Sequence, residues 1–133
     1  MAHEEKVLKS IKPFIGLSKE TEMHQPVLSY YLKLYAVQKL STAYQSFKSQ
    51  GKSIDKVAGF MQQMMGALKQ KKQSMGQQLD KTQNEVALMK FILNMFARYV
   101  KEYETGVATK MTGKNLLSCS RFIETLAVFQ PLN

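Results

Sequence analysis

The sequence predicts an all-α protein built from antiparallel helical bundles. Its three prolines, Pro13, Pro26 and Pro131, lie far apart, and its seven glycines occur singly rather than in hairpin turns. Segments of alternating polarity that are rich in β-branched residues, which mark strands, do not occur. Apolar residues instead recur every three or four positions, which is the period of an amphipathic helix. We therefore expect about five main helices with short connections between them.

The first two helices are delimited by prolines. Pro13 favours the first position of a helix that runs to about Met23, after an irregular or helical lead-in. The residue before Pro26 avoids the α region, so a second helix is expected to begin at Pro26 and to continue to about Phe47. Most of its residues are apolar, and such a helix must be enclosed by neighbours on several sides.

The third helix has the clearest apolar pattern. Ser53 is expected to cap it, and Asp55 in its first turn suits the positive end of the helix dipole. Met65 lies about 60° from the centre of the apolar seam on a helical wheel, so we expect it to line a groove rather than the core. The seam residues, mostly three or four positions apart, are Ile54, Val57, Met61, Met64, Leu68 and Met75.

The stretch around Gly76 separates two expected units, residues 1–76 and 77–133. Gly76 can end a helix, and Asp80 or Thr82 can begin the next. A helix from about 81 to 103 carries two apolar stripes, and two stripes imply two packing partners. The first stripe is Val86, Met89, Leu93, Phe96, Val100 and Tyr103, and the second is Leu88, Ile92, Met95 and Tyr99.

A fifth helix is expected from about Val107 to Phe129, before Pro131. Its expected buried residues are Leu116, Cys119, Ile123, Leu126 and Phe129. The single cysteine excludes an internal disulfide and fits a reducing compartment. No apolar run reaches the ~20 residues that cross a bilayer, and the charged N-terminus does not fit a secretory signal. We expect a soluble, cytoplasmic protein.

The chain is basic, with 19 Lys and Arg against 10 Asp and Glu, for a net charge of +9. The excess lies in the first half, where residues 1–76 hold 12 basic and 5 acidic groups, a net +7. An anionic partner is therefore expected. Because 17 of the 19 cations are lysine, the composition argues against a module that reads bases with arginine forks.

Catalytic material is scarce. His3 and His24 have no Cys or His partner at metal-ligand spacing, and the sequence contains no glycine-rich phosphate loop, GxSxG or HExxH motif. We expect neither an enzyme nor a bound cofactor or metal.

Methionines suggest a binding surface on the third helix. Nine occur in the chain, and methionine adapts its shape to apolar side chains of a partner. With lysines beside Met65, this edge suits an amphipathic helix that carries leucines and acids, laid in the groove between the second and third helices. The expected partner-binding residues are Met61, Met65, Leu68, Lys69 and Lys72. The alternative is a basic bundle in which the Lys33 to Lys72 region binds anionic lipid or nucleic acid.

The stretch PVLSYYLKLYAVQ (26–38) resembles the second helix of the N-terminal region of the Vta-one family, whose animal member is LYST-interacting protein five. The motif KSI at 9–11 stands at the family's distance before it, and MMGALKQKKQSMG (64–76) matches the family's LMxxLxALKKQLG. Glu124 replaces a family aspartate. Collinear matches follow at Gly106, Lys110, Lys114, Ser120, Ile123, Val128 and Phe129.

The resemblance implies a tandem of two MIT (microtubule-interacting and trafficking) domains, each a three-helix bundle. The second would lack its last helix, because the sequence reads VFQPLN where the family continues past VFGEL. The implied function is a protein-binding adaptor of the ESCRT and multivesicular-body pathway, which binds C-terminal tails of ESCRT-III subunits. One leucine-bearing tail helix would contact Met65 and then Leu68, and a subunit of the CHMP-five or Vps-sixty kind would engage the second domain.

The resemblance also implies a role in a regulator of the Vps-four AAA ATPase, with indirect recruitment to endosomal membranes and no nucleic-acid partner. The family's acidic linker and C-terminal dimerisation domain are not found in these 133 residues. We therefore do not expect these residues to stimulate the ATPase.

Overall fold

The structure, a computed structural model, describes residues 2–129. Within that range it contains five α-helices and two short 3-10 helices and no strand, so the all-α prediction is confirmed. The helices are α1 (His3–Thr21), α2 (Pro26–Ser49), α3 (Asp55–Met75), η1 (Gly76–Leu79), α4 (Lys81–Glu104), α5 (Lys110–Thr125) and η2 (Leu126–Phe129). The chain divides into two compact units, unit 1 (residues 1–79) and unit 2 (residues 80–133). The boundary expected after Gly76 falls inside η1.

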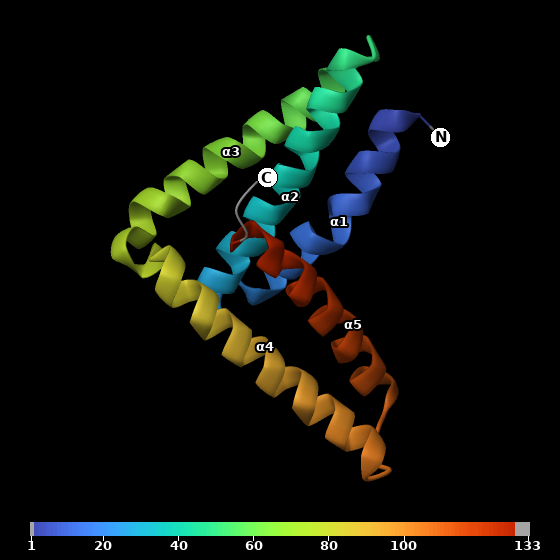
Figure 1. The fold of residues 1–133 in the computed structure, drawn as a ribbon, viewed down its shortest axis with the longest axis vertical. Helices are drawn as coiled ribbons and strands as arrows, with labels where there is room; N and C mark the ends of the chain where they lie inside the picture. The colour runs from blue at the N-terminus through green and yellow to red at the C-terminus, as the bar shows by residue number, and fades with distance from the viewer. Residues whose placement is uncertain (1, 130–133) are drawn as a thin grey trace. The chain divides into compact units, whose positions relative to one another are not determined.

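Unit 1 is a bundle of three helices in which α2 lies between α1 and α3 (Figure 1). Pro26 occupies the first turn of α2, where its missing N–H costs no hydrogen bond. The position of α2 explains its composition, because a helix that packs against two neighbours must be apolar on two sides. The core residues of the unit are Ile11, Phe14, Leu28, Tyr31, Leu32, Ala36, Val37, Leu40, Val57, Met64 and Leu68.

A lysine on the apolar α2 covers aromatic rings between α1 and α2. The Nζ atom of Lys39 lies 5.7 Å from the ring centroid of Phe14 and 5.5 Å from that of Tyr35. A cation over an aromatic face is attracted by the ring, and its aliphatic stem covers apolar surface. The stem of Lys39 therefore covers the two rings, while its ammonium group stays in contact with solvent.

Two small polar side chains join α1 to α2 inside the bundle. The Ser18 hydroxyl donates to the Ser29 carbonyl at 2.8 Å, and the Ser29 hydroxyl donates to the Ser18 carbonyl at 2.6 Å. The two hydroxyl oxygens are 2.9 Å apart, and both residues are buried. This reciprocal pair satisfies both hydroxyls without water, as buried polar groups require.

The N-terminal end of α1 holds the start of α3. The Glu4 carboxylate accepts from the backbone N–H groups of Lys56 at 3.0 Å and Val57 at 3.1 Å, and the Ser53 hydroxyl donates to its other oxygen at 3.2 Å. The His3 Nε2 lies 2.7 Å from the Ser53 carbonyl oxygen. Glu4 thus satisfies N–H groups that the first turn of any helix leaves without partners.

Burial works to raise the pKa of the Glu4 carboxyl, but hydrogen bonds from Val57, Ser53 and Lys56 outweigh it and lower that pKa. The prediction that Ser53 caps α3 is wrong, because its hydroxyl is turned to Glu4 and the N-cap residue is Ile54. The lead-in before Pro13, expected to be irregular or helical, is helical: α1 begins at His3, so Pro13 lies inside the helix and not at its first position. The contacts of Glu4 with α3 stabilise the turns before that proline.

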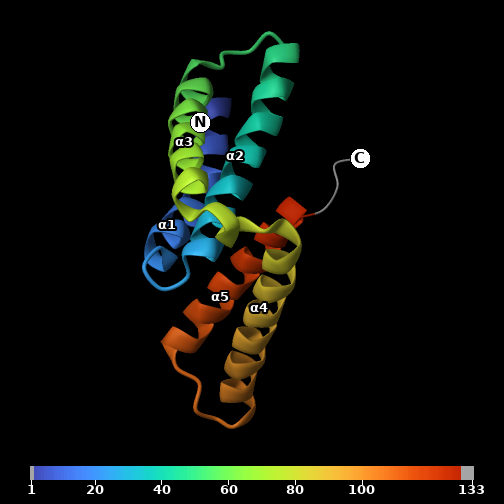
Figure 2. The same cartoon turned by 90° about the vertical axis from the view of Figure 1, so that its left-hand side faces the viewer.

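Unit 2 contains the antiparallel pair α4 and α5, followed by η2 (Figure 2). The side chain of Asp80 caps α4 by accepting from the Gln83 N–H at 2.9 Å. Thr109 caps α5 in a reciprocal pair of hydrogen bonds with Thr112. The chain leaves α3 and α4 through Gly76 and Gly106, which have φ values of 54° and 76° in the region that favours glycine.

Only one of the two stripes on α4 is buried within unit 2. The buried apolar residues of the unit are Leu88, Ile92, Cys119, Phe122, Val128 and Phe129. The prediction that Ile123 is buried is wrong, since 47% of its surface is exposed. The predicted start of the last helix at Val107 is also wrong, because Val107 precedes the Thr109 cap and is exposed. Among the described residues, none of the helices has the length and apolar content that a membrane span requires.

Candidate functional site

The candidate site lies on α3, where a buried seam borders an exposed edge. Met64 and Leu68 are 7% and 6% exposed, whereas Met65 between them is 52% exposed. Met61 is half-buried, and Lys69 and Lys72 are exposed. The predicted departure of Met65 from the seam is confirmed. We call Met65, Lys69 and Lys72 the Met65 edge.

The Met65 edge lies on the side of α3 that faces away from α1. Phe60 marks the opposite side, because it lines a hollow together with residues of α1. At about 100° per residue, Met65 is about 140° from Phe60 around the helix axis, and Lys72 is about 120° from it.

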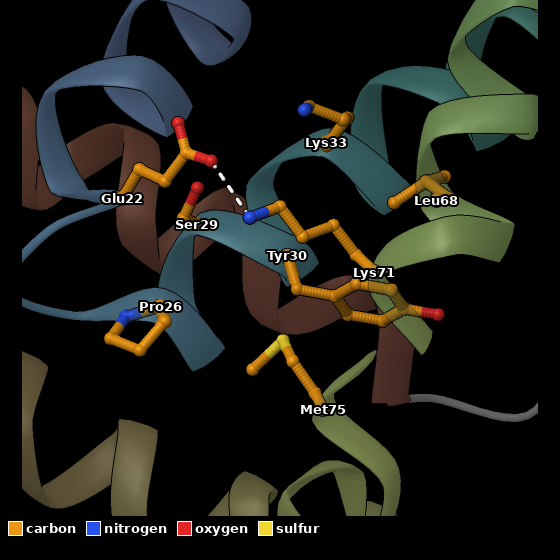
Figure 3. Close-up of a pocket in the computed structure, with 8 residues that line it drawn as sticks. All are labelled: Glu22, Pro26, Ser29, Tyr30, Lys33, Leu68, Lys71 and Met75. Atoms are coloured by element: carbon orange, nitrogen blue, oxygen red, sulfur yellow. Dashed lines mark ion pairs between the residues drawn. The ribbon is translucent and has the colours of Figure 1, made fainter. Parts of the chain in front are cut away.

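A small cavity of about 50 Å³ lies at the C-terminal end of α3 (Figure 3). It is lined by Glu22, Pro26, Ser29, Tyr30, Lys33, Leu68, Lys71 and Met75. Its lining includes Leu68 of the predicted site but not Met61 or the Met65 edge. The structure therefore brings only one predicted residue to this cavity, and Leu68 contributes little surface to it because it is almost fully buried.

Charges bordering this cavity are paired in part. Lys71 Nζ lies 2.8 Å from a carboxylate oxygen of Glu22. This hydrogen bond and the charge of Lys71 lower the pKa of Glu22, against the effect of burial and with a further contribution from Lys33. Burial, and next the neighbouring Tyr31, raise the pKa of Tyr30. Lys71 is engaged with Glu22, whereas Lys69 and Lys72 appear in no ion pair within 4.0 Å among the described residues.

A larger hollow of about 670 Å³ lies between α1 and α3. It is lined by Glu5, Leu8, Lys9, Lys12, Ile15, Gly16, Lys19 and Phe60. The sequence signal for this hollow is the mixture of lysines and apolar residues along α1. The hollow is not part of the predicted site.

Other chemistry is not evident in the described part of the chain. No group of three or more His, Cys, Asp or Glu side chains is placed to hold a metal ion among residues 2–129. Cys119 is fully buried, and burial raises the pKa of its thiol. A buried thiol with a raised pKa is a poor nucleophile. The Cys119 thiol of unit 2 is therefore not a candidate nucleophile in the native fold.

Comparison with known proteins identifies the family to which this all-α chain belongs. A family model described as Vta1 like matches residues 10–133, so the chain belongs to the Vta1-like family, a family of regulatory adaptors in the ESCRT pathway. The chain is 24% identical over 132 residues to an Arabidopsis thaliana protein named as a homolog of mammalian LYST-interacting protein 5. The match covers 99% of this chain and 30% of that relative, so the chain spans about a third of the relative's length.

Proposed function

We propose that unit 1 is a protein-binding adaptor domain of the MIT type, which binds C-terminal tail helices of ESCRT-III subunits along the Met65 edge. The observation that carries the proposal is the exposure of Met65, an apolar side chain 52% exposed between two buried seam residues. The family to which the chain belongs supports an ESCRT partner.

The chemistry of the edge favours an acidic amphipathic helix. Met65 offers a flexible apolar contact for a leucine of the tail, and Lys69 and Lys72 follow it at one and two further turns of α3. A helix laid parallel to α3 would present its own apolar residues at the same spacing. The lysines would speed association with an acidic tail, and salt would weaken their contribution.

The expected affinity is modest. A short tail peptide must fold as it binds, which costs a few kcal/mol, so we expect a Kd of ~10 to 100 μM. Burial of the exposed half of Met65 would contribute about 1 kcal/mol. Met65→Asp would remove that contribution and place an acid against an acidic peptide, which together predict a loss of affinity of about tenfold or more.

Titration of an ESCRT-III tail peptide into the full chain tests the proposal. The matched control is Met23→Asp, since Met23 is 86% exposed in the turn after α1 and lies outside the Met65 edge. We expect the control to bind as the unchanged chain does and Met65→Asp to bind much more weakly. Equal affinity of Met65→Asp and the unchanged chain would refute the assignment of the site.

The alternative, an anionic lipid or nucleic-acid surface, has a different signature. Such binding would depend steeply on salt and hardly on Met65. A pelleting assay with anionic vesicles at physiological salt, without peptide, separates the two. Retention that is equal for Met65→Asp and the unchanged chain would favour the lipid surface.

The proposed cellular role follows from the family to which the chain belongs. Unit 1 would bring the protein to endosomal membranes through ESCRT-III tails, and unit 2 would serve as a second MIT-type unit. The protein would thereby take part in the regulation of a Vps4-type ATPase. In this role the chain acts without a cofactor and catalyses no reaction of its own.

A further inference from the structure

One apolar face of α4 is largely open within unit 2, and the Tyr103 hydroxyl at its C-terminal end lies beside Gly113 of α5. α4 packs against α5 and η2, and its buried apolar side chains are Leu88 and Ile92. A second row on the same helix is between 43% and 59% exposed. We call this row, together with the half-buried Val100, the α4 seam; its exposed members are Val86, Met89, Leu93, Phe96 and Tyr103.

The α4 seam has the spacing of a coiled-coil interface. Its six residues are separated alternately by three and four positions, from Val86 to Tyr103. At 1.5 Å per residue the seam is about 25 Å long. A helix that carries such a repeat buries it against another helix.

Exposure of the α4 seam to water is unfavourable for a unit as small as unit 2. Its described part is one helical pair with a short 3-10 helix, and units of about 50 residues bury only a small core. A contiguous apolar row on so small a unit marks an interaction site.

We propose that the α4 seam binds the α4 seam of a second copy of this chain, with the two α4 helices antiparallel. The seam is complementary to itself in that direction, because each large side chain then meets a smaller one of the partner copy. The three layers of that register are Leu93 with Phe96, Met89 with Val100, and Val86 with Tyr103.

The flanking residues permit the same register. Beside the seam, Lys90 faces Ala97 of the partner copy, and Gln83 faces Glu104 of the partner copy. Neither contact opposes two like charges, so the antiparallel arrangement meets no electrostatic penalty there. Because each α4 keeps its own α5, the dimer forms a four-helix bundle, the common way in which helical pairs complete a core. The inference concerns unit 2 and does not depend on the proposed function of unit 1.

Molar mass across a concentration series tests this association on the full chain. The monomer has a mass of 15.2 kDa, and we expect the weight-average mass to approach twice that value as the concentration rises from about 10 to about 200 μM. Leu93→Glu places a charge in both copies of the central layer and is expected to weaken association by about tenfold or more.

Met111→Glu is the matched control, because Met111 on α5 is 59% exposed, as Leu93 is, and lies outside the α4 seam. It is expected to associate as the unchanged chain does. Circular dichroism verifies that both variants keep their helical content. A chain that remains monomeric over the whole range, or a dimer that Leu93→Glu leaves intact, would overturn the proposal.

Disulfide trapping tests the direction of the helices independently. Lys90→Cys and Ala97→Cys chains, mixed under oxidising conditions, are expected to cross-link to each other. Lys90→Cys chains kept apart from the mixture should not cross-link, because Lys90 faces Ala97 and the two Lys90 positions are therefore about two turns apart along the helix axis. The native Cys119 does not compete, since it is fully buried. A dimer without cross-links in the mixture would refute the antiparallel register.

Discussion

The serine pair between α1 and α2 allows a quantitative test of how unit 1 is held together. Ser18→Ala or Ser29→Ala removes one buried hydroxyl that donates to the facing carbonyl at 2.8 or 2.6 Å. Ser18 lies in the last turn of α1 and Ser29 in the first turn of α2, and the carbonyl of Ser18 also accepts from the Thr21 hydroxyl at 3.3 Å. The loss should therefore be near the low end for a buried hydrogen bond, about 1 kcal/mol for each substitution.

The two effects should not add. The hydroxyl oxygens are 2.9 Å apart, so the first substitution already removes a contact that the second would break. We expect the double variant to lose about 1.5 kcal/mol, which is about 0.5 kcal/mol less than the sum of the single losses. Ser41→Ala on the exposed surface of α2 is the control and should change stability by less than about 0.5 kcal/mol.

Amide hydrogen exchange of Leu32 and Ala36 measures these free energies within unit 1. Both residues are fully buried on α2, so their exchange reports opening of the bundle. Losses below about 0.3 kcal/mol for the single variants, or a double variant that equals their sum, would contradict a coupled buried pair.

The other predictions concern pH, the thiol and a helix cap. Glu4→Gln removes the charge that caps α3, so it should lower the melting temperature by several degrees near neutral pH. Glu5→Gln should change the melting temperature little, because the Glu5 carboxylate only lies 3.7 Å from an exposed lysine. Folding lowers the pKa of Glu4 from its ordinary 4.5, so the stabilisation by the charged carboxylate is fully present above pH 4.5 and is lost as the pH falls through the folded pKa. The melting temperatures of the unchanged chain and of Glu4→Gln should therefore converge as the pH falls through that value. Cys119, buried with a raised pKa, should react with a thiol reagent only as unit 2 opens, and rapid labelling of the native chain would contradict its placement. Thr109→Ala should lower the free energy of unfolding of unit 2 by about 1 kcal/mol, as measured by urea unfolding. An unchanged urea midpoint would show that the Thr109 cap does not stabilise the unit.

Much of the fold could be predicted because local residues determine where helices begin and end. Pro26 starts α2, Gly76 ends α3 and Asp80 caps α4, each through a backbone requirement that the residue satisfies by itself. The exposure of Met65 also followed from helical geometry, since its angle to the seam depends only on its position in α3.

Contacts between distant residues could not be predicted in this way. The start of α1 depends on Glu4 reaching α3, about fifty positions further along the chain, and the same contact takes Ser53 away from the cap that its position suggested. The cavity beside Leu68 likewise requires Glu22 and Lys71 to meet at the end of the bundle.

The α4 helix shows where the two kinds of information separate. Periodicity by itself determined that α4 has two apolar stripes, because the spacing of side chains around a helix is a local property. Only the tertiary structure decided which stripe is buried: Leu88 and Ile92 lie inside unit 2, whereas Leu93 is 59% exposed. The physical reason is that burial requires a neighbouring surface, and the position of that surface depends on how the rest of the chain folds around the helix.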